Sequence, residues 1–157
     1  MNAKVELSGD AIADWLPDES LCETWINAAL ACADKHGHYV VSVRFVDESE
    51  STAINNQYRD KNSASNVLSF PANIPGNISS LLEFEPLGDI VLCPEIVAEE
   101  ADSQNKSLAS HWAHLLIHGL LHLLAYDHQH RGGAEVMEAL EIKALERLSI
   151  PNPYLVV

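Results

Sequence analysis

The spacing of apolar and polar residues along the chain predicts four strands and five helices. Short apolar or alternating runs predict strands at residues 2–7, 38–46, 66–71 and 88–93. Helical periodicity or helical composition predicts helices at residues 19–36, 48–59, 94–103, 108–124 and 134–148. Strands and helices are interleaved in this order, which is typical of an α+β fold. We therefore expect a small mixed β-sheet packed against several α-helices.

Signals at the ends of the segments support these boundaries. Asp18 can cap the first helix, and Gly37 follows its predicted end. Pro94 suits the first position of the third helix. Residues 72–86 contain the turn-rich run NIPGNISS, so we expect a variable loop or a flap there.

Length and charge limit the classes of protein to which the chain can belong. Its 157 residues suit one domain, residues 1–157. Nine Lys and Arg against 23 Asp and Glu give a net charge of −14, which argues against non-specific nucleic-acid binding through a broad basic face. The start, MNAKVELSGD, lacks the pattern of a signal peptide, and the longest nearly apolar stretch is far shorter than the roughly 20 residues of a membrane span. We therefore expect a cytoplasmic protein that does not bind membranes, with its three cysteines reduced in the core.

Six of the eight histidines lie in one segment, HWAHLLIHGLLHLLAYDHQH, residues 111–130. His118 and His122 are four residues apart, so both imidazoles can bind one ion from the same helix face. On an unbroken helix His128 would lie about 15 Å beyond His118, so the helix must end near residues 124–125 and the chain must fold back. Three neutral imidazoles with an open fourth position form a zinc site of the catalytic type, with one ion per chain. The alternative is a helix with surface or core histidines, but burying such rings without partners costs about 1–3 kcal/mol.

The spacing of these histidines is also that of the metzincin proteases. Those enzymes carry a glutamate directly after the first histidine, where it acts as general base. Here that position is Gly119, which cannot accept a proton. A metal-dependent peptidase or amidohydrolase is therefore the second hypothesis rather than the first.

Several segments together resemble one family. HGLLHLLAYDH at 118–128 resembles the HGxLHLxGYDH signature of the YbeY endoribonucleases, the bacterial ribosomal RNA maturation factors. Further segments are similar to that family at 55–71 (NNQYRDKNSASNVLSFP), 88–95 (GDIVLCPE) and 137–154 (MEALEIKALERLSIPNPY). The resemblance thus covers most of the chain.

This resemblance implies a function and a set of site residues. The implied function is a zinc-dependent endoribonuclease specific for single-stranded RNA, acting in 3′-end maturation of small-subunit ribosomal RNA and in ribosome quality control. The metal ligands carry over to His118, His122 and His128, and the phosphate-contacting arginine to Arg59. The implied partners are ribosomal RNA and the small ribosomal subunit with its proteins. A third hypothesis is a non-enzymatic ribosome assembly factor in which the metal is structural.

The chain departs from the family pattern at three informative positions. Ala125 replaces a glycine at the turn where the chain must fold back; if that turn needs positive φ, alanine costs about 1 kcal/mol more than glycine. Ser65 and Asn66 replace Thr-Asp, so the hydroxyl is kept and the negative charge is lost. Any salt bridge or proton transfer by that aspartate is therefore absent or weakened here.

The remaining polar residues have simpler interpretations. His111 and His114 are expected to contact a metal ligand or to lie on the surface, because the helix rise carries them away from the ion. Asp127 can orient an imidazole or cap the turn. The acidic residues of the third helix are expected to form a solvated face: Glu95, Glu99, Glu100 and Asp102.

Overall fold

The computed structural model describes residues 3–11, 13, 15–79, 81–126 and 132–155. These residues form a four-stranded sheet and six helices, which confirms the α+β class. The elements are β1 (Ala3–Ser8), α1 (Glu19–Cys32), β2 (Tyr39–Phe45), α2 (Glu48–Arg59), β3 (Val67–Pro71), α3 (Gly76–Ser79), β4 (Glu85–Leu92), α4 (Pro94–Ser103), α5 (Leu108–Leu123) and α6 (Gly133–Arg147).

The sheet is mixed, as the sequence predicts. Its strand order is β1-β2-β4-β3, with β1 parallel to β2, β2 parallel to β4, and β3 antiparallel to β4. Val41, Val43 and Phe45 alternate along β2 and are all buried, because successive strand residues point to opposite faces. The hydrophobic face of β2 therefore points into the main core.

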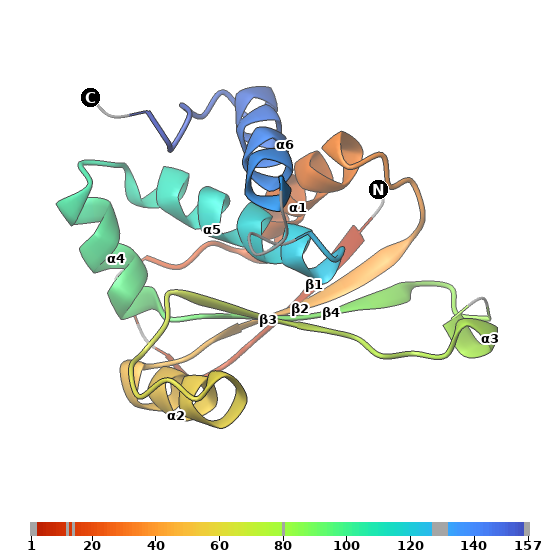
Figure 1. Ribbon diagram of the computed structural model, residues 1–157, viewed down its shortest axis with the longest axis horizontal. Coiled ribbons are helices and arrows are strands. Elements are labelled where there is room, and N and C mark those ends of the chain that lie inside the picture. Colours follow the sequence, from red (N-terminus) through yellow and green to blue (C-terminus); the bar gives the residue numbers. More distant parts are fainter. Residues whose placement is uncertain (1–2, 12, 14, 80, 127–131, 156–157) are drawn as a thin grey trace.

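Helices cover both faces of the sheet. Figure 1 shows α1, α5 and α6 on one face and α2 on the other. The larger core lies under α1, α5 and α6, and a smaller cluster of Val46, Leu68 and Val91 forms a second core. Helix α5 packs against β3, β4, α1, α4 and α6, which places its histidines inside the fold rather than on an outer edge. No helix in the described ranges is both long enough and apolar enough to cross a membrane.

Local capping explains most helix boundaries. Asp18 accepts a hydrogen bond from the amide of Leu21 (2.8 Å), as expected for an N-cap. The predicted end of α1 at residue 36 is wrong: the helix stops at Cys32. Asp34 adopts a left-handed conformation (φ 57°), and the amide of Lys35 donates back to the carbonyl of Leu30 (2.9 Å), which closes the helix early.

Residues 72–86 form more regular structure than a loop. They contain α3, and β4 begins at Glu85, three residues before the predicted strand, because Glu85 pairs with Tyr39 of β2. The β3–β4 hairpin is extended by a hydrogen bond from the amide of Ala72 to the carbonyl of Leu87 (3.0 Å). In Figure 1 the two strands project together beyond the helices, with α3 at the tip. The predicted flap is therefore an arm built on the sheet.

Candidate active site

Two of the predicted metal ligands, His118 and His122, lie side by side on α5. Their Nε2 atoms are 3.1 Å apart. Tetrahedral zinc with Zn–N bonds of about 2.0–2.1 Å places two ligand nitrogens about 3.3 Å apart. The observed separation is close to that value, so this pair fits a zinc ion.

The chain turns directly after these histidines, as the ligand spacing requires. Helix α5 ends at Leu123, and the amide of Tyr126 donates to the carbonyl of Leu121 (3.0 Å). Ala125 adopts φ 75°, so this turn does need the positive φ that favours glycine. The third predicted ligand, His128, lies outside the described residues, as do Asp127 and His130. The remaining described residues add no further ligand to form a cluster of three.

A buried carboxylate of α6 holds the first histidine. Glu141 is fully buried and accepts hydrogen bonds from His118 Nδ1 (3.1 Å), His114 Nε2 (2.9 Å) and the Tyr154 hydroxyl (2.9 Å). Burial alone would raise the pKa of Glu141, but the hydrogen bonds and charges of His114 and His118 outweigh it and lower the pKa to about 2. The carboxylate is therefore ionised and keeps the proton of His118 on Nδ1. With the proton on Nδ1, the lone pair of His118 Nε2 is available next to Nε2 of His122, where one ion could bind both nitrogens. The same arrangement occurs in carboxylate–histidine–zinc sites.

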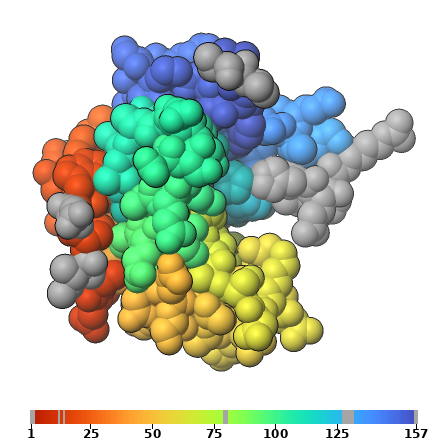
Figure 2. All heavy atoms as spheres, turned by 90° about the vertical axis from the view of Figure 1, so that its left-hand side faces the viewer, coloured from red at the N-terminus to blue at the C-terminus, as the bar shows by residue number. Residues whose placement is uncertain are grey.

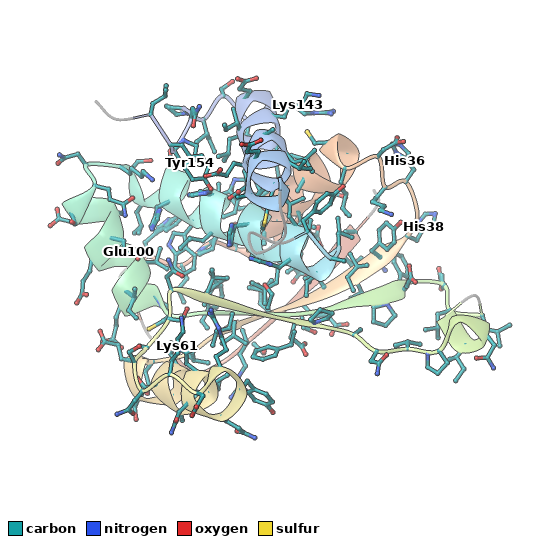
Figure 3. All side chains as sticks on the ribbon, in the orientation of Figure 1. His36, His38, Lys61, Glu100, Lys143 and Tyr154 are labelled. Carbon is teal, nitrogen blue, oxygen red and sulfur yellow. The ribbon has the colours of Figure 1, made fainter. Side chains whose placement is uncertain are left out.

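Glu141 and Tyr154 are functional candidates that the sequence analysis missed. Tyr154, labelled in Figure 3, comes from the tail after α6. A signal for Glu141 exists in the sequence, because it falls four residues after Met137 and four before Leu145 on the apolar stripe of α6. His114, expected either to contact a metal ligand or to lie on the surface, is largely buried and shares the Glu141 carboxylate with His118.

Gly119 packs tightly against the side chains of the sheet. A Cβ atom there would lie 2.9 Å from Ile90 Cγ2, 3.1 Å from Ser69 Oγ and 3.3 Å from Val67 Cγ2. The Ser69 hydroxyl also donates to the Gly119 carbonyl (3.0 Å), which ties α5 to β3. The position that carries the general base in a metzincin protease therefore faces packed side chains of the sheet in this protein.

A cavity of about 760 Å³ connects the histidines with Arg59. Its wall is formed by β3 and the residues before it, by Arg59 at the end of α2, and by His118, His122 and Ala125. Arg59 is exposed and forms no ion pair within the described residues, whereas Arg44 is paired with Glu50 at 2.7 Å. The fold therefore brings a guanidinium that is not paired with any carboxylate of the described residues into the same cavity as the two imidazoles.

Comparison with known proteins identifies the family. The family model described as endoribonuclease YbeY matches residues 11–149. The chain belongs to the YbeY family. The YbeY endoribonuclease of Colwellia psychrerythraea is 44% identical over 142 residues, covering 89% of each chain. That of Pseudomonas putida is 46% identical over 138 residues, covering 88% of this chain and 85% of its own.

A solved structure supports the fold. The solution structure of the Thermotoga maritima protein TM1509 aligns over 92% of this chain and 91% of its own, with a TM-score of 0.55 and 24% sequence identity. At that identity the likeness concerns the fold alone. It agrees with the α+β architecture described above.

The structure explains one departure from the YbeY pattern through a partner that the sequence did not indicate. Asn66 donates from Nδ2 to both Glu100 oxygens (3.0 and 3.3 Å) and accepts from the Val67 amide (2.7 Å). Glu100 also bonds Nε2 of His111 (2.9 Å). Figure 2 shows α4, the helix of Glu100, between α2 and the C-terminal helix. The Asn66 amide therefore donates to the Glu100 carboxylate, whereas an aspartate at this position would place a second negative charge beside it.

This contact corrects the interpretation of the acidic helix face. Glu95, Glu99 and Asp102 are exposed, but Glu100 is half-buried and bonded on both sides. His111 is buried rather than on the surface, and burial lowers its pKa more than Glu100 raises it. Neither Glu100 nor His111 lines the cavity. Their contacts instead link α4 to Asn66, directly before β3, and to α5.

Proposed function

We propose that the protein, as one domain of residues 1–157, is a zinc-dependent endoribonuclease that cleaves single-stranded ribosomal RNA. Its proposed roles are maturation of the 3′ end of small-subunit ribosomal RNA and ribosome quality control in the cytoplasm. The relatives named above are endoribonucleases by name. The observation that carries the proposal is a single cavity lined by Arg59, His118 and His122, in which the Nε2 atoms of the two histidines are 3.1 Å apart.

Each residue of the site has a defined task in this proposal. His118, His122 and His128 hold one zinc ion, and Glu141 fixes the proton and orientation of His118. Bound zinc would supply Lewis-acid chemistry that polarises a phosphoryl oxygen and makes water a better nucleophile. Arg59 binds the scissile phosphate through its forked N–H groups and stabilises the negative charge that grows during cleavage.

The close packing at Gly119 argues against a peptidase. A metal-dependent peptidase of this spacing needs a carboxylate beside the first ligand to move a proton. A Cβ atom at position 119 would press against the side chains of Ile90 (2.9 Å) and Ser69 (3.1 Å), which would have to shift. In RNA cleavage the ribose 2′-hydroxyl can act as an internal nucleophile, and bound zinc would supply chemistry that makes this hydroxyl or a water molecule easier to deprotonate without a carboxylate at position 119.

The acidic character of the chain implies a docking partner. Affinity for free RNA comes mainly from counterions released at Lys and Arg contacts. The chain has nine such residues in all, and Arg44 is already paired with Glu50. We therefore propose that the small ribosomal subunit and its basic proteins supply much of the affinity.

Metal content and RNA cleavage, measured together, test the function. We expect one zinc per chain by elemental analysis, and cleavage of single-stranded RNA that stops with chelator and returns with zinc. His122→Ala should lose both metal and cleavage, whereas His36→Ala, at an exposed histidine, should lose neither. Full zinc occupancy in His122→Ala would contradict the site. Zinc binding without any RNA cleavage would instead favour an assembly factor with a structural metal.

A further inference from the structure

An aromatic side chain in the wall of the cavity has no role in the function proposed so far. Tyr58 is 62% exposed and lines the cavity directly beside Arg59. Among the other described aromatic residues only Tyr154 is exposed, and its hydroxyl is bonded to Glu141. An isolated exposed ring on a surface is ordinary. An exposed ring in the cavity that holds the candidate metal ligands suggests contact with the substrate.

The ring of Tyr58 is held in place by a second ring. Tyr58 and Phe70 make an edge contact, with centroids 5.0 Å apart and planes inclined by 63°. Phe70 also lines the cavity, and it packs against the small cluster of Val46, Leu68 and Val91. Because Phe70 is anchored in this small core, Tyr58 has a fixed support. The Tyr58 hydroxyl has no hydrogen-bond partner in the described part of the chain, so the exposed aromatic ring is the group that Tyr58 offers to a ligand.

We propose that Tyr58, supported by Phe70, is a stacking platform for an unpaired nucleobase of the RNA, next to the phosphate bound by Arg59. The inference rests on the proposed endoribonuclease function and adds a base-binding subsite to it. Proteins that bind single-stranded nucleic acid combine cationic groups for the backbone with aromatic rings for the bases. Residues 58 and 59 present one group of each kind to the same cavity.

This subsite would account for a preference for single strands. Bases in a duplex are stacked on their neighbours and cannot lie on a protein ring, whereas bases of a loop or an end can. Stacking accepts every base, since each has an aromatic face. It also supplies affinity that does not depend on positive charge, which a chain with a net charge of −14 lacks.

The test compares two oligonucleotides of equal length and charge on the full-length, zinc-loaded protein. One is a short oligoadenylate, and the other has the same backbone with abasic units. Binding is measured by fluorescence anisotropy in the cold, and gels confirm that the strands stay intact. The wild type should bind the base-bearing strand about 5- to 100-fold more tightly, the range expected for stacking of a base on an aromatic ring.

Two variants at position 58 separate stacking from bulk. Tyr58→Leu keeps apolar volume and removes the ring, so the preference for bases should be lost. Tyr58→Phe keeps the ring, so the preference should remain. Phe84→Leu makes the same change at a ring that contacts His38 outside the cavity, and it should leave the preference unchanged.

The outcomes distinguish this inference from the proposed function. Equal binding of the two strands by the wild type, or a preference that survives in Tyr58→Leu, overturns the base subsite. If the wild type still cleaves single-stranded RNA in that case, the endoribonuclease proposal stands without the subsite. A zinc-loaded wild type that neither binds nor cleaves RNA overturns both.

Discussion

Replacing Glu141 by Gln tests how far a residue without access to the cavity controls the metal site. Glutamine has nearly the same shape as glutamate, so the change removes a charge with little change in packing. Its carbonyl oxygen can still accept from His118 and His114, and its amide group can donate to the Tyr154 hydroxyl. What is lost is the negative charge that accepts the hydrogen bond from His118 Nδ1, which lies 3.1 Å from Glu141 Oε1.

The magnitude follows from that contact. Hydrogen bonds to an ionised group are about twice as strong as neutral ones, so His118 becomes a less basic and less firmly oriented ligand. Loss of a carboxylate behind a ligating histidine typically weakens metal affinity about 10- to 100-fold, or about 1.4 to 2.7 kcal/mol. We expect the dissociation constant for zinc to rise by this factor in Glu141→Gln.

The assay is a competition titration with a zinc-binding dye. Glu146→Gln, an exposed change on the same helix, serves as the matched control and should not alter the affinity. Tyr154→Phe removes one donor but keeps the charge of Glu141, so its effect should be smaller than that of Glu141→Gln. An unchanged zinc affinity in a folded Glu141→Gln protein would refute the assigned link between this carboxylate and the metal.

Four further changes test other parts of the site and its support. Arg59→Ala should lower kcat/KM for RNA about 100-fold with zinc content and Tm unchanged, since the side chain is exposed; unfolding of the variant would make Arg59 a structural residue. Ala125→Gly relieves about 1 kcal/mol of strain at φ 75° but loosens the unfolded chain, so the free energy of unfolding should rise by at most about 1 kcal/mol in a thermal melt, and a fall of that size would contradict the need for positive φ. Asn66→Asp places a second carboxylate where the amide now lies 3.0 Å from Glu100, so urea unfolding should show a loss of stability that is greater at neutral than at acidic pH. His111 has a lowered pKa when folded, so the unfolded chain binds its proton more readily below the ordinary value of 6.5 and stability falls as pH falls; in metal-free protein His111→Gln should reduce the loss measured between about pH 7.5 and about pH 5.5.

The elements of the fold followed largely from local signals. Helix α2 has the predicted bounds, and α4, α5 and α6 differ from prediction by at most a residue at either end. The exceptions depend on contacts that sequence spacing does not show. The end of α1 is set by the left-handed backbone at Asp34, and the start of β4 is set by pairing of Glu85 with β2.

The candidate site divides in the same way. The spacing of His118 and His122 predicts their neighbouring Nε2 atoms, because one helix carries both. Glu141 reaches His118 from another helix, 23 residues away, and only packing of α6 on α5 brings them together. Glu100 was assigned to a solvated face because helical spacing does not reveal that Asn66 lies across from it.

The packing at Gly119 has a consequence for how such a scaffold can change during evolution. The histidine spacing suggests that one codon change, from glycine to glutamate, would convert a nuclease into a protease. The packing opposes this change, because a Cβ atom at position 119 would lie 2.9 Å from Ile90 Cγ2 and 3.1 Å from Ser69 Oγ, so these side chains, or α5 with both histidines, would have to shift. Smaller residues at the facing positions of β3 and β4 would open space for glutamate, but the same changes would remove contacts between α5 and the sheet. The two chemistries share a ligand spacing, but in this chain a glutamate at position 119 would also require the facing side chains of the sheet to adjust.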